Sequence, residues 1–319
     1  MITRSLFSHS REFTIDSLAE LLPLAQKLRA ADATAPYIIA VKGGTYRGHI
    51  AFPYSYFYIK GKGARIVDSR YAKALDENGQ ELTTWKTATL KVTGDHNIFE
   101  GLVIENDAGD PQSKGQEVAL AVYGDDNLFL QVTMLSTQDT LFSGPLPDDL
   151  ATRYLGFLPE EERYREGNCR NYYIDCSIRG SVDFIFGAGQ ADFYRCDLIS
   201  CDDGRKNTYV CAPSHSLKDD YGYFFCRCRF LGDGVEADTV YLARPWRDYG
   251  KAVFYRSEFA PHIKAEGYSD WNQERRCATA RFEEYPLPQG RVSWVKNAAT
   301  DALPSRYSEE AKRLEEEYR

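Results

Sequence analysis

The sequence predicts an all-β solenoid in which short strands form coils that stack on one another. From Tyr37 to about residue 300 the chain consists of short strand patterns broken by Gly, Asp and Asn, without a convincing long helix. One strand pattern also recurs as a whole, in residues 97–104, 127–134, 171–178, 191–198, 222–230 and 252–259. Its aligned aromatic residues, which lie 30, 44, 20, 32 and 29 residues apart, are Phe99, Phe129, Tyr173, Phe193, Phe225 and Phe254. A shortest interval of 20 residues with a variable excess is typical of stacked coils that carry inserted loops at fixed corners.

A solenoid of this kind predicts ladders of buried side chains, because each coil packs its inward residues against equivalent residues of its neighbours. The aligned aromatic residues are expected to form one such ladder. A second ladder is expected from Val132, Cys176, Cys196 and Cys228. The alternative is an antiparallel sandwich with similar strands, which is disfavoured because hairpin signals such as Asn-Gly between alternating apolar residues are scarce.

The solenoid is expected to begin with a helical cap. Residues 14–32 predict a helix whose apolar face comprises Leu18, Leu21, Leu22, Ala25 and Leu28. Ser17 and Glu20 predict a capping box at its start. Pro23 weakens the prediction, because an interior proline removes a backbone hydrogen bond. Residues 37–41 then predict a buried strand.

Two further segments interrupt the strand pattern, and the whole chain, residues 1–319, is interpreted as a single β-helix domain. Residues 143–168 are rich in Pro, Asp, Glu and Arg and predict an inserted surface loop or small lid. Residues 308–319 predict a charged amphipathic C-terminal helix with Ala311, Leu314 and Tyr318 on one face. We expect this helix to cap an open end of the solenoid.

Composition excludes some classes of function. The net charge of −8 argues against a nucleic-acid partner, because phosphate binding needs clustered Lys and Arg. No run approaches 18 consecutive apolar residues, so no membrane span is expected. The first ten residues lack an apolar core and a small-residue cleavage site, which predicts a cytoplasmic location, or a secreted one if the sequence is a trimmed mature form. A monomer is expected.

The eight cysteines all lie in the second half of the chain, and none forms a C-x-x-C pair. Their spacing does not match a zinc site, so we expect buried, reduced thiols. Cys226 and Cys228, one residue apart, are expected to face the same side of a strand.

Three motifs supply the groups that point to chemistry. Asp183 lies in the strand pattern of residues 180–187, and a buried unpaired carboxylate costs several kcal/mol, so it needs a partner or a function. The upstream motif Gln138-Asp139-Thr140-Leu141 adds a second carboxylate and an amide, and residues 242–246 add Arg244 and Trp246. If residues 143–168 are looped out, Asp139 and Asp183 lie on neighbouring coils about 5 Å apart.

Such a pair of carboxylates divides acid and base roles. The one held ionised by Arg244 is a nucleophile or base, and the other, partly desolvated, keeps its proton and acts as an acid. Gln138 donates to a developing oxyanion, and Trp246 offers a ring face to a sugar. The histidines lie outside these motifs and no G-x-S-x-G is present, which disfavours a Ser-His-Asp hydrolase. Grouped metal ligands are not evident either.

The sequence resembles the pectin methylesterases (pectinesterases), a carbohydrate esterase family built on a right-handed parallel β-helix. The motifs that carry this resemblance lie in the family's order, at residues 41–46, 116–120, 138–141, 182–187 and 242–246. The resemblance implies hydrolysis of C6 methyl esters of galacturonate units, on a methyl-esterified oligogalacturonide or pectin. It implies neither a metal nor an organic cofactor.

The resemblance also implies roles for five catalytic residues. Asp183 matches the nucleophile, and Asp139 matches the acid that protonates departing methanol and then activates water. Gln138 and Gln116 match the amides that stabilise the oxyanion. Arg244 matches the residue that orients Asp183 and lowers its pKa.

Further positions match the family's substrate groove, which is lined here by Trp246, Phe186, Phe142 and Val182. Three residues depart from the family pattern without removing a catalytic group. Phe142 stands where Tyr is usual, Ala243 where Gly is usual, and Ala188 where Asn is common. Exported relatives often bridge positions like Cys176 and Cys196, which we expect to be free thiols in a cytoplasmic protein.

Two alternatives stay open at this point. One is a non-catalytic β-helical carbohydrate-binding or adhesion protein, which two converging carboxylates disfavour. The other is a related esterase or thioesterase that acts on a different acyl group.

Overall fold

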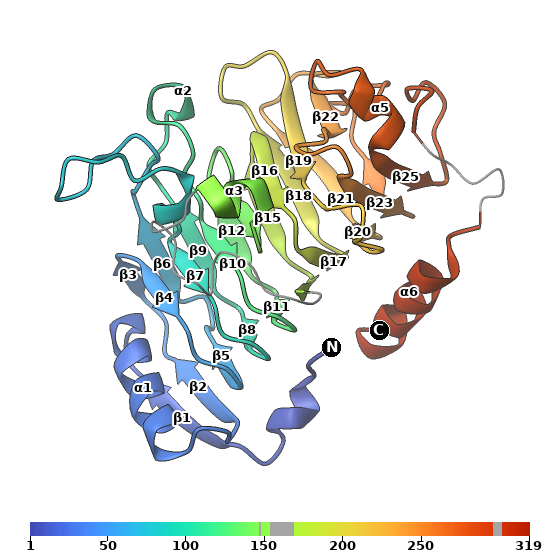
Figure 1. Cartoon of the computed structure of the whole chain (residues 1–319). Coiled ribbons are helices and arrows are strands. Elements are labelled where there is room, and N and C mark those ends of the chain that lie inside the picture. The colour runs from blue at the N-terminus through green and yellow to red at the C-terminus, as the bar shows by residue number, and fades with distance from the viewer. Residues whose placement is uncertain (147, 154–168, 296–301) are drawn as a thin grey trace.

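The protein is described by a computed structural model, which covers residues 1–146, 148–153, 169–295 and 302–319. Its strands form three parallel sheets that wind together into one β-helix (Figure 1). Every pairing between the strands of these sheets is parallel, so the antiparallel sandwich is excluded. None of the described helices is long and apolar enough to cross a membrane.

The sheets are named A, B and C. Sheet A contains, in spatial order, β1 (Arg11–Ile15), β2 (Tyr37–Val41), β5 (Phe57–Lys60), β8 (Ile98–Glu100), β11 (Leu128–Leu130), β14 (Arg170–Ile174), β17 (Gln190–Tyr194), β20 (Tyr223–Cys226), β23 (Lys251–Tyr255) and β25 (Arg281–Tyr285). Sheet B contains β3 (Thr45–Arg47), β6 (Arg65–Asp68), β9 (Val103–Asn106), β12 (Thr133–Leu135), β15 (Ser177–Gly180), β18 (Asp197–Cys201), β21 (Arg229–Asp233) and β24 (Glu258–Phe259). Sheet C contains β4 (Ile50–Phe52), β7 (Leu90–Val92), β10 (Leu120–Val122), β13 (Leu141–Ser143), β16 (Val182–Gly187), β19 (Thr208–Pro213) and β22 (Val240–Ala243). The described helices are α1 (Leu21–Ala31), α2 (Pro111–Lys114), α3 (Asp148–Arg153), α5 (Arg275–Thr279) and α6 (Ser305–Glu317).

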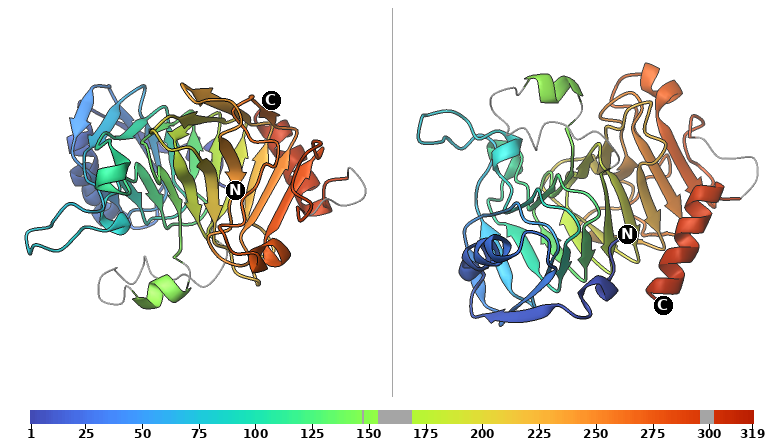
Figure 2. Two further views of the ribbon diagram at one scale, coloured as in Figure 1. Left: turned by 90° about the horizontal axis from the view of Figure 1, so that it is seen from above. Right: turned by 60° about the horizontal axis from the view of Figure 1, so that its bottom comes forward.

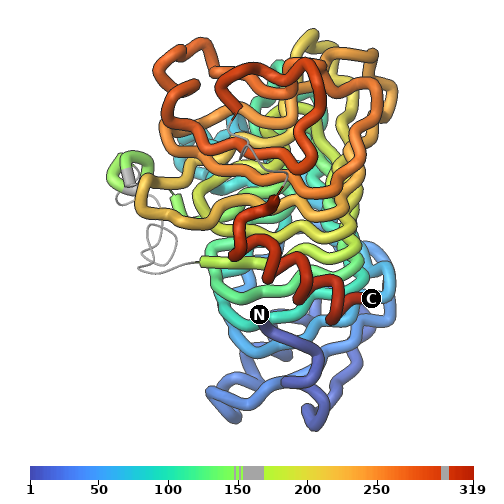
Figure 3. The backbone as a smooth tube through the Cα atoms, turned by 90° about the vertical axis from the view of Figure 1, so that its right-hand side faces the viewer, coloured from blue at the N-terminus to red at the C-terminus, as the bar shows by residue number. Residues whose placement is uncertain are grey.

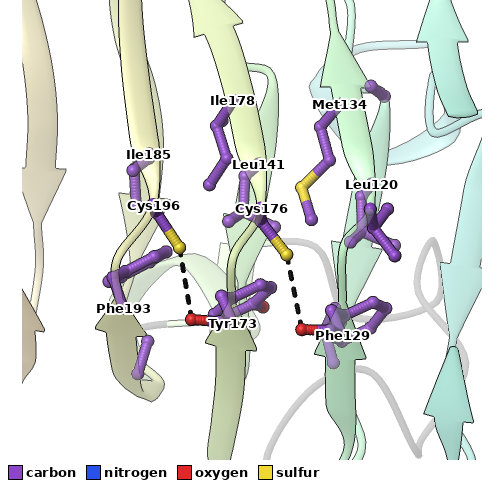
Figure 4. Close-up of a cluster of buried hydrophobic side chains, with 14 of the residues drawn as sticks. Leu120, Phe129, Met134, Leu141, Tyr173, Cys176, Ile178, Ile185, Phe193 and Cys196 are labelled. Atoms are coloured by element: carbon purple, nitrogen blue, oxygen red, sulfur yellow. Dashed lines mark hydrogen bonds between the residues drawn. The ribbon is translucent and has the colours of Figure 1, made fainter. Parts of the chain in front are cut away.

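The predicted aromatic ladder is confirmed. The six aromatic residues pair in register across sheet A, from Phe99 to Phe254. Their rings stack inside the helix with successive centroids 5.2, 5.1, 4.8, 4.7 and 4.9 Å apart. Leu120, Leu141 and Ile185 face this ladder from sheet C (Figure 4). The aromatic residue of the sequence repeat is therefore the position that points inward in each coil.

The second ladder is also buried, and its thiols are free. The Cys176 thiol donates to the carbonyl oxygen of Phe129 at 3.3 Å, and the Cys196 thiol to that of Tyr173 at 3.2 Å (Figure 4). Burial raises the pKa of both thiols well above the usual range. Each thiol thus satisfies a carbonyl of the coil below it instead of forming a disulfide.

A single left-handed residue turns the chain from sheet A to sheet B in six successive coils. These residues, with φ between 48° and 64°, are Gly101, Gln131, Asp175, Arg195, Arg227 and Arg256. The turn at Arg227 explains why one prediction was wrong. Cys228 packs in the core, whereas Cys226 lies on the outer face of sheet A, so the two cysteines do not share a side.

The N-terminal helix covers the first coil, but it is shorter than residues 14–32. Residues 14 and 15 belong to β1 instead, because they pair with Ala40 and Val41 of β2. The capping box of Ser17 and Glu20 is present and precedes a 3₁₀ turn at Leu18–Glu20. Pro23 is tolerated because it lies in the first turn of α1, where backbone N–H groups lack partners within the helix. The apolar face of α1 packs on the core at that end (Figures 1 and 2).

The C-terminal helix does not cap an open end, which corrects the prediction for residues 308–319. Helix α6 begins earlier, at Ser305, and crosses the outer face of sheet A (Figure 3). Its residues Tyr307, Ala311 and Leu314 are buried there. The helix also forms an ion pair with sheet A, since Arg170 of β14 contacts Glu310 at 3.2 Å. An amphipathic helix buries its apolar face against an apolar surface, and here that surface is the outer face of sheet A.

Candidate active site

Four of the five predicted catalytic residues lie on consecutive coils, near the N-terminal ends of three neighbouring strands in the middle of sheet C. Gln116 precedes β10, Gln138 and Asp139 precede β13, and Asp183 lies in β16. Gln138 pairs with Val182 in a parallel bridge, and the backbone N–H of Asp139 donates to the carbonyl oxygen of Val182 at 3.1 Å. The backbones of Asp139 and Asp183 therefore lie side by side on neighbouring coils, one strand spacing of about 5 Å apart.

Both aspartates have a left-handed backbone, with φ of 63° at Asp139 and 49° at Asp183. Strand β16 carries one extra residue at this point, because Val182 pairs with Tyr209 while Ile185 pairs with Cys211. Aspartate tolerates the left-handed region better than most residues, and such a bulge re-aims a side chain. The bulge thus re-aims the Asp183 carboxylate, whereas the residues that follow it, Phe184 and Ile185, are buried in the core.

Arg244 holds the Asp183 carboxylate from two coils further on, directly after β22. Its Nε donates to Oδ1 at 2.8 Å and its Nη2 to Oδ2 at 2.6 Å. The guanidinium lies between two rings, 3.8 Å from the centroid of Tyr209 and 3.6 Å from that of Trp271. These contacts hold the guanidinium in an orientation that points its Nε and Nη2 donors toward Asp183.

The two carboxyl groups differ in their electrostatics, although each aspartate is only 8% exposed. Burial and the neighbouring Asp183 charge raise the pKa of Asp139 well above its usual range. Burial also raises the pKa of Asp183, but Arg244 opposes that rise through its charge and its hydrogen bonds. The pair is therefore built so that Asp183 loses its proton first and Asp139 retains one.

The two predicted amides have different surroundings. The Oε1 atom of Gln138 accepts a hydrogen bond from Arg205 Nη1 at 2.9 Å, and the Gln138 side chain opposes the rise in the pKa of Asp139. Gln116 lies on the coil before and is held through its backbone, whose carbonyl accepts from Ala72 N–H at 2.9 Å. Within the described ranges, the Gln116 side chain has no hydrogen-bond partner. Its predicted role in oxyanion stabilisation stays a prediction.

Three of the four residues predicted to line the groove, Phe142, Phe186 and Trp246, pack in one aromatic cluster, and Val182 lies outside that cluster. Trp85 stacks on Trp246 with ring centroids 6.4 Å apart, and its ring lies 5.3 Å from Phe142 and 6.3 Å from Phe186. Phe142, Phe186 and Val182 are 1%, 3% and 5% exposed. Only Trp246 of the four is partly exposed. The structure brings the three aromatic side chains together, but it buries Phe142, Phe186 and Val182, and the contact of all four residues with a substrate stays a prediction.

The predicted lid of residues 143–168 contributes to this cluster where it is described. Leu146 and Leu150 pack with the aromatic residues, and Asp149 of α3 forms an ion pair with Arg247 at 2.7 Å. Residues 154–168 lie outside the described residues.

Four side chains of the site escaped the sequence analysis: Trp85, Arg205, Tyr209 and Trp271. The two tryptophans carried a usable signal, because the whole chain has only 4 and a tryptophan outside the repeat invites a functional explanation. Tyr209 lies in an ordinary strand pattern, and Arg205 lies in a polar loop. Neither can be distinguished by residue type alone.

Comparisons with known proteins agree with this architecture. The sequence profile of the Pectinesterase family matches residues 17–145 and 164–303. Solved structures of pectin methylesterases from carrot and from Yersinia enterocolitica share the fold, the right-handed parallel β-helix. They have TM-scores of 0.70 and 0.71, identities of 23% and 24%, and matches that cover 90% and 89% of this chain and 88% and 95% of theirs.

Curated relatives are similar over much of the sequence. Pectinesterase QRT1 of Arabidopsis thaliana is 31% identical over 284 residues, which cover 83% of this chain and 66% of that protein. Pectinesterase 2 of the same plant is 28% identical, and the match covers 86% of this chain and 46% of that protein. The chain thus spans about half to two thirds of the length of these relatives. The family profile and the shared fold together show that the chain belongs to the Pectinesterase family.

Proposed function

We propose that this protein hydrolyses C6 methyl esters of galacturonate units, in oligogalacturonides or pectin, and releases methanol. The proposal rests on one observation: of the two adjacent buried aspartates, Asp139 and Asp183, only Asp183 accepts two hydrogen bonds from Arg244. One solved pectin methylesterase of the same fold is described in complex with a hexasaccharide, which supports a saccharide ligand.

In the first step, the ionised Asp183 carboxylate attacks the ester carbonyl carbon and forms a tetrahedral oxyanion. Amide N–H groups of Gln138 and Gln116 stabilise the oxyanion. The protonated Asp139 then gives its proton to the methoxy oxygen as the C–O bond breaks. Methanol leaves, and the substrate acyl group remains joined to Asp183 as an anhydride.

In the second step, the ionised Asp139 acts as a base. It takes a proton from water, and the resulting hydroxide oxygen bonds to the acyl carbon. Cleavage of the anhydride releases a galacturonate carboxyl group and restores the Asp183 carboxylate, while Asp139 regains its proton. Both carboxyl groups thus return to their starting state.

The direct test is methanol release from methylated trigalacturonate. Asp183→Asn should abolish release, because an amide cannot form the anhydride, while ligand binding and the circular dichroism spectrum are kept. Asp197→Asn is the matched control, because Asp197 makes a similar two-point pair with Arg229 away from sheet C. Methanol release by Asp183→Asn at the wild-type rate contradicts the nucleophile assignment.

The same assays separate the alternatives. A non-catalytic carbohydrate-binding protein binds the trisaccharide but releases no methanol in the wild-type form. An esterase or thioesterase for another acyl group is inactive on the trisaccharide and hydrolyses acetylated sugars or an acyl-CoA.

A further inference from the structure

The amide of Gln138 has a charged partner that fixes which way it faces. Arg205 Nη1 donates to Gln138 Oε1 at 2.9 Å. A guanidinium has donors only, so the amide oxygen must face Arg205. The NH₂ group is thereby turned away from Arg205, and the polar Gln138 side chain opposes the rise in the pKa of the neighbouring Asp139 carboxyl.

Arg205 is itself firmly held. The Asp203 carboxylate, whose side chain is 1% exposed, accepts from Arg205 Nε at 2.8 Å and also from its Nη2. The Ser181 hydroxyl donates to the same carboxylate. From α2, Gln112 Nε2 donates to the backbone carbonyl of Asp203 at 2.7 Å. The loop around Arg205 is therefore fixed both to the strand segment of the nucleophile and to the segment before Gln116.

We infer that Arg205 is a positioning residue for ester hydrolysis, one that holds the Gln138 amide with its N–H groups toward the reacting carbonyl. The inference rests on the proposed function. The last torsion of a glutamine is roughly two-fold, so an amide without this partner also populates the flipped state. In that state a carbonyl oxygen faces the oxyanion and repels it.

Arg205 has a second effect through its charge. Its cation lowers the pKa of both Asp139 and Asp183, against the rise that burial causes. Loss of the charge should raise the pKa of both carboxyl groups. Because activity needs Asp183 ionised and Asp139 protonated, both limbs of the pH–rate profile should then move to higher pH.

The experiment compares Arg205→Met, which removes the donors and the charge, with Arg205→Lys, which keeps the charge but not the flat two-point pairing with Asp203. For methylated trigalacturonate we expect Arg205→Met to lower kcat about 100-fold, the scale of losing one oxyanion donor, and to change KM less than about 3-fold. Both limbs of the pH–rate profile should move to higher pH in Arg205→Met. Arg205→Lys should also lose kcat but keep its limbs near those of the wild type.

Arg195→Met is the control, because Arg195 forms a two-point pair with Asp175 at the corner between sheets A and B. It should leave kcat and both limbs unchanged. A substrate-binding role for Arg205 instead predicts a higher KM at unchanged kcat, and that result overturns the inference.

A readout without turnover distinguishes failure of this inference from failure of the proposed function. Carboxyl ¹³C NMR titration reports the pKa of Asp139 whether or not the trisaccharide is a substrate. An upward shift in Arg205→Met supports the electrostatic coupling even if wild-type protein releases no methanol. An unchanged pKa overturns the electrostatic effect of Arg205, and an unchanged kcat in Arg205→Met of an active wild-type esterase overturns the positioning of the Gln138 amide.

Discussion

The guanidinium of Arg244 binds the Asp183 carboxylate through two hydrogen bonds, of 2.8 and 2.6 Å, from a position two coils away. This pairing opposes the rise in the pKa of Asp183 that burial causes. It also favours the anionic form of Asp183 over that of the adjacent Asp139. The first prediction tests that relationship.

Replacing Arg244 with Ala should raise the pKa of Asp183, because a cation that favours the anionic form is lost. Since the nucleophile must be ionised, the acid limb of kcat/KM for a methylated trisaccharide should move to higher pH. We also expect at least a 100-fold loss of activity at neutral pH, because the nucleophile loses its orientation. Arg229→Ala, which breaks the pair with Asp197, serves as the control. An acid limb that stays in place in Arg244→Ala contradicts the pairing.

Replacing Asp183 with Asn should lower the pKa of Asp139. The charge of Asp183 contributes to the raised pKa of Asp139, so its removal makes the ionised form of Asp139 less costly. Arg244, released from its partner, adds to the same effect. Carboxyl ¹³C NMR titration of both proteins measures the shift. If the pKa of Asp139 is the same in both, the two carboxyl groups do not interact.

The sequence was enough to predict the coils, because each coil repeats an inward aromatic position and the stacking follows from that repeat. It could not predict the corners between sheets A and B. Gly101, Gln131 and Arg227 share a left-handed backbone there but no side-chain chemistry, so residue type gives no signal. The surface that α6 covers was missed for a related reason, because an amphipathic pattern shows that a face is buried without showing against what.

The site was predicted as far as its residues belong to recognisable motifs. Asp139, Asp183 and Arg244 converge as expected, although they lie on three different coils. Arg205 could not be predicted, because its contact with Gln138 depends on the relative placement of two loops. The packing of Trp85 over the groove residues depends on placement in the same way. The cytoplasmic location and the monomeric state stay predictions.

The aromatic ladder should dominate the stability of the middle coils. Phe193 is fully buried, and its ring stacks on Tyr173 and Phe225 at 4.8 and 4.7 Å. Phe193→Ala should lower the free energy of unfolding by about 3–5 kcal/mol, because it leaves a cavity between two rings. Denaturant unfolding measures this loss. Leu217→Ala, at a side chain that is 65% exposed, should change it by no more than about 0.5 kcal/mol.

The docking of α6 should depend on one buried carboxylate. Asp192 is fully buried and accepts from Arg170 Nε at 2.6 Å and from the Tyr221 hydroxyl at 2.5 Å. Arg170 in turn contacts Glu310 of α6, so Asp192→Ala leaves a buried cation short of its main partner. We expect a loss of about 3–5 kcal/mol in the free energy of unfolding, the usual result when one member of a buried pair is removed.

The loss should be local as well as global, because α6 meets the rest of the protein on this face of sheet A. Hydrogen exchange should become faster in residues 305–317 of Asp192→Ala, while the aromatic ladder keeps its protection. The exposed pair of Lys312 and Glu316 provides a control on the same helix, since Glu316→Gln removes a surface charge at 3.9 Å from its partner. Its effect should stay within about 1 kcal/mol. If α6 exchanges no faster in Asp192→Ala than in Glu316→Gln, its apolar residues alone hold it on the sheet and the charge network does not fix it.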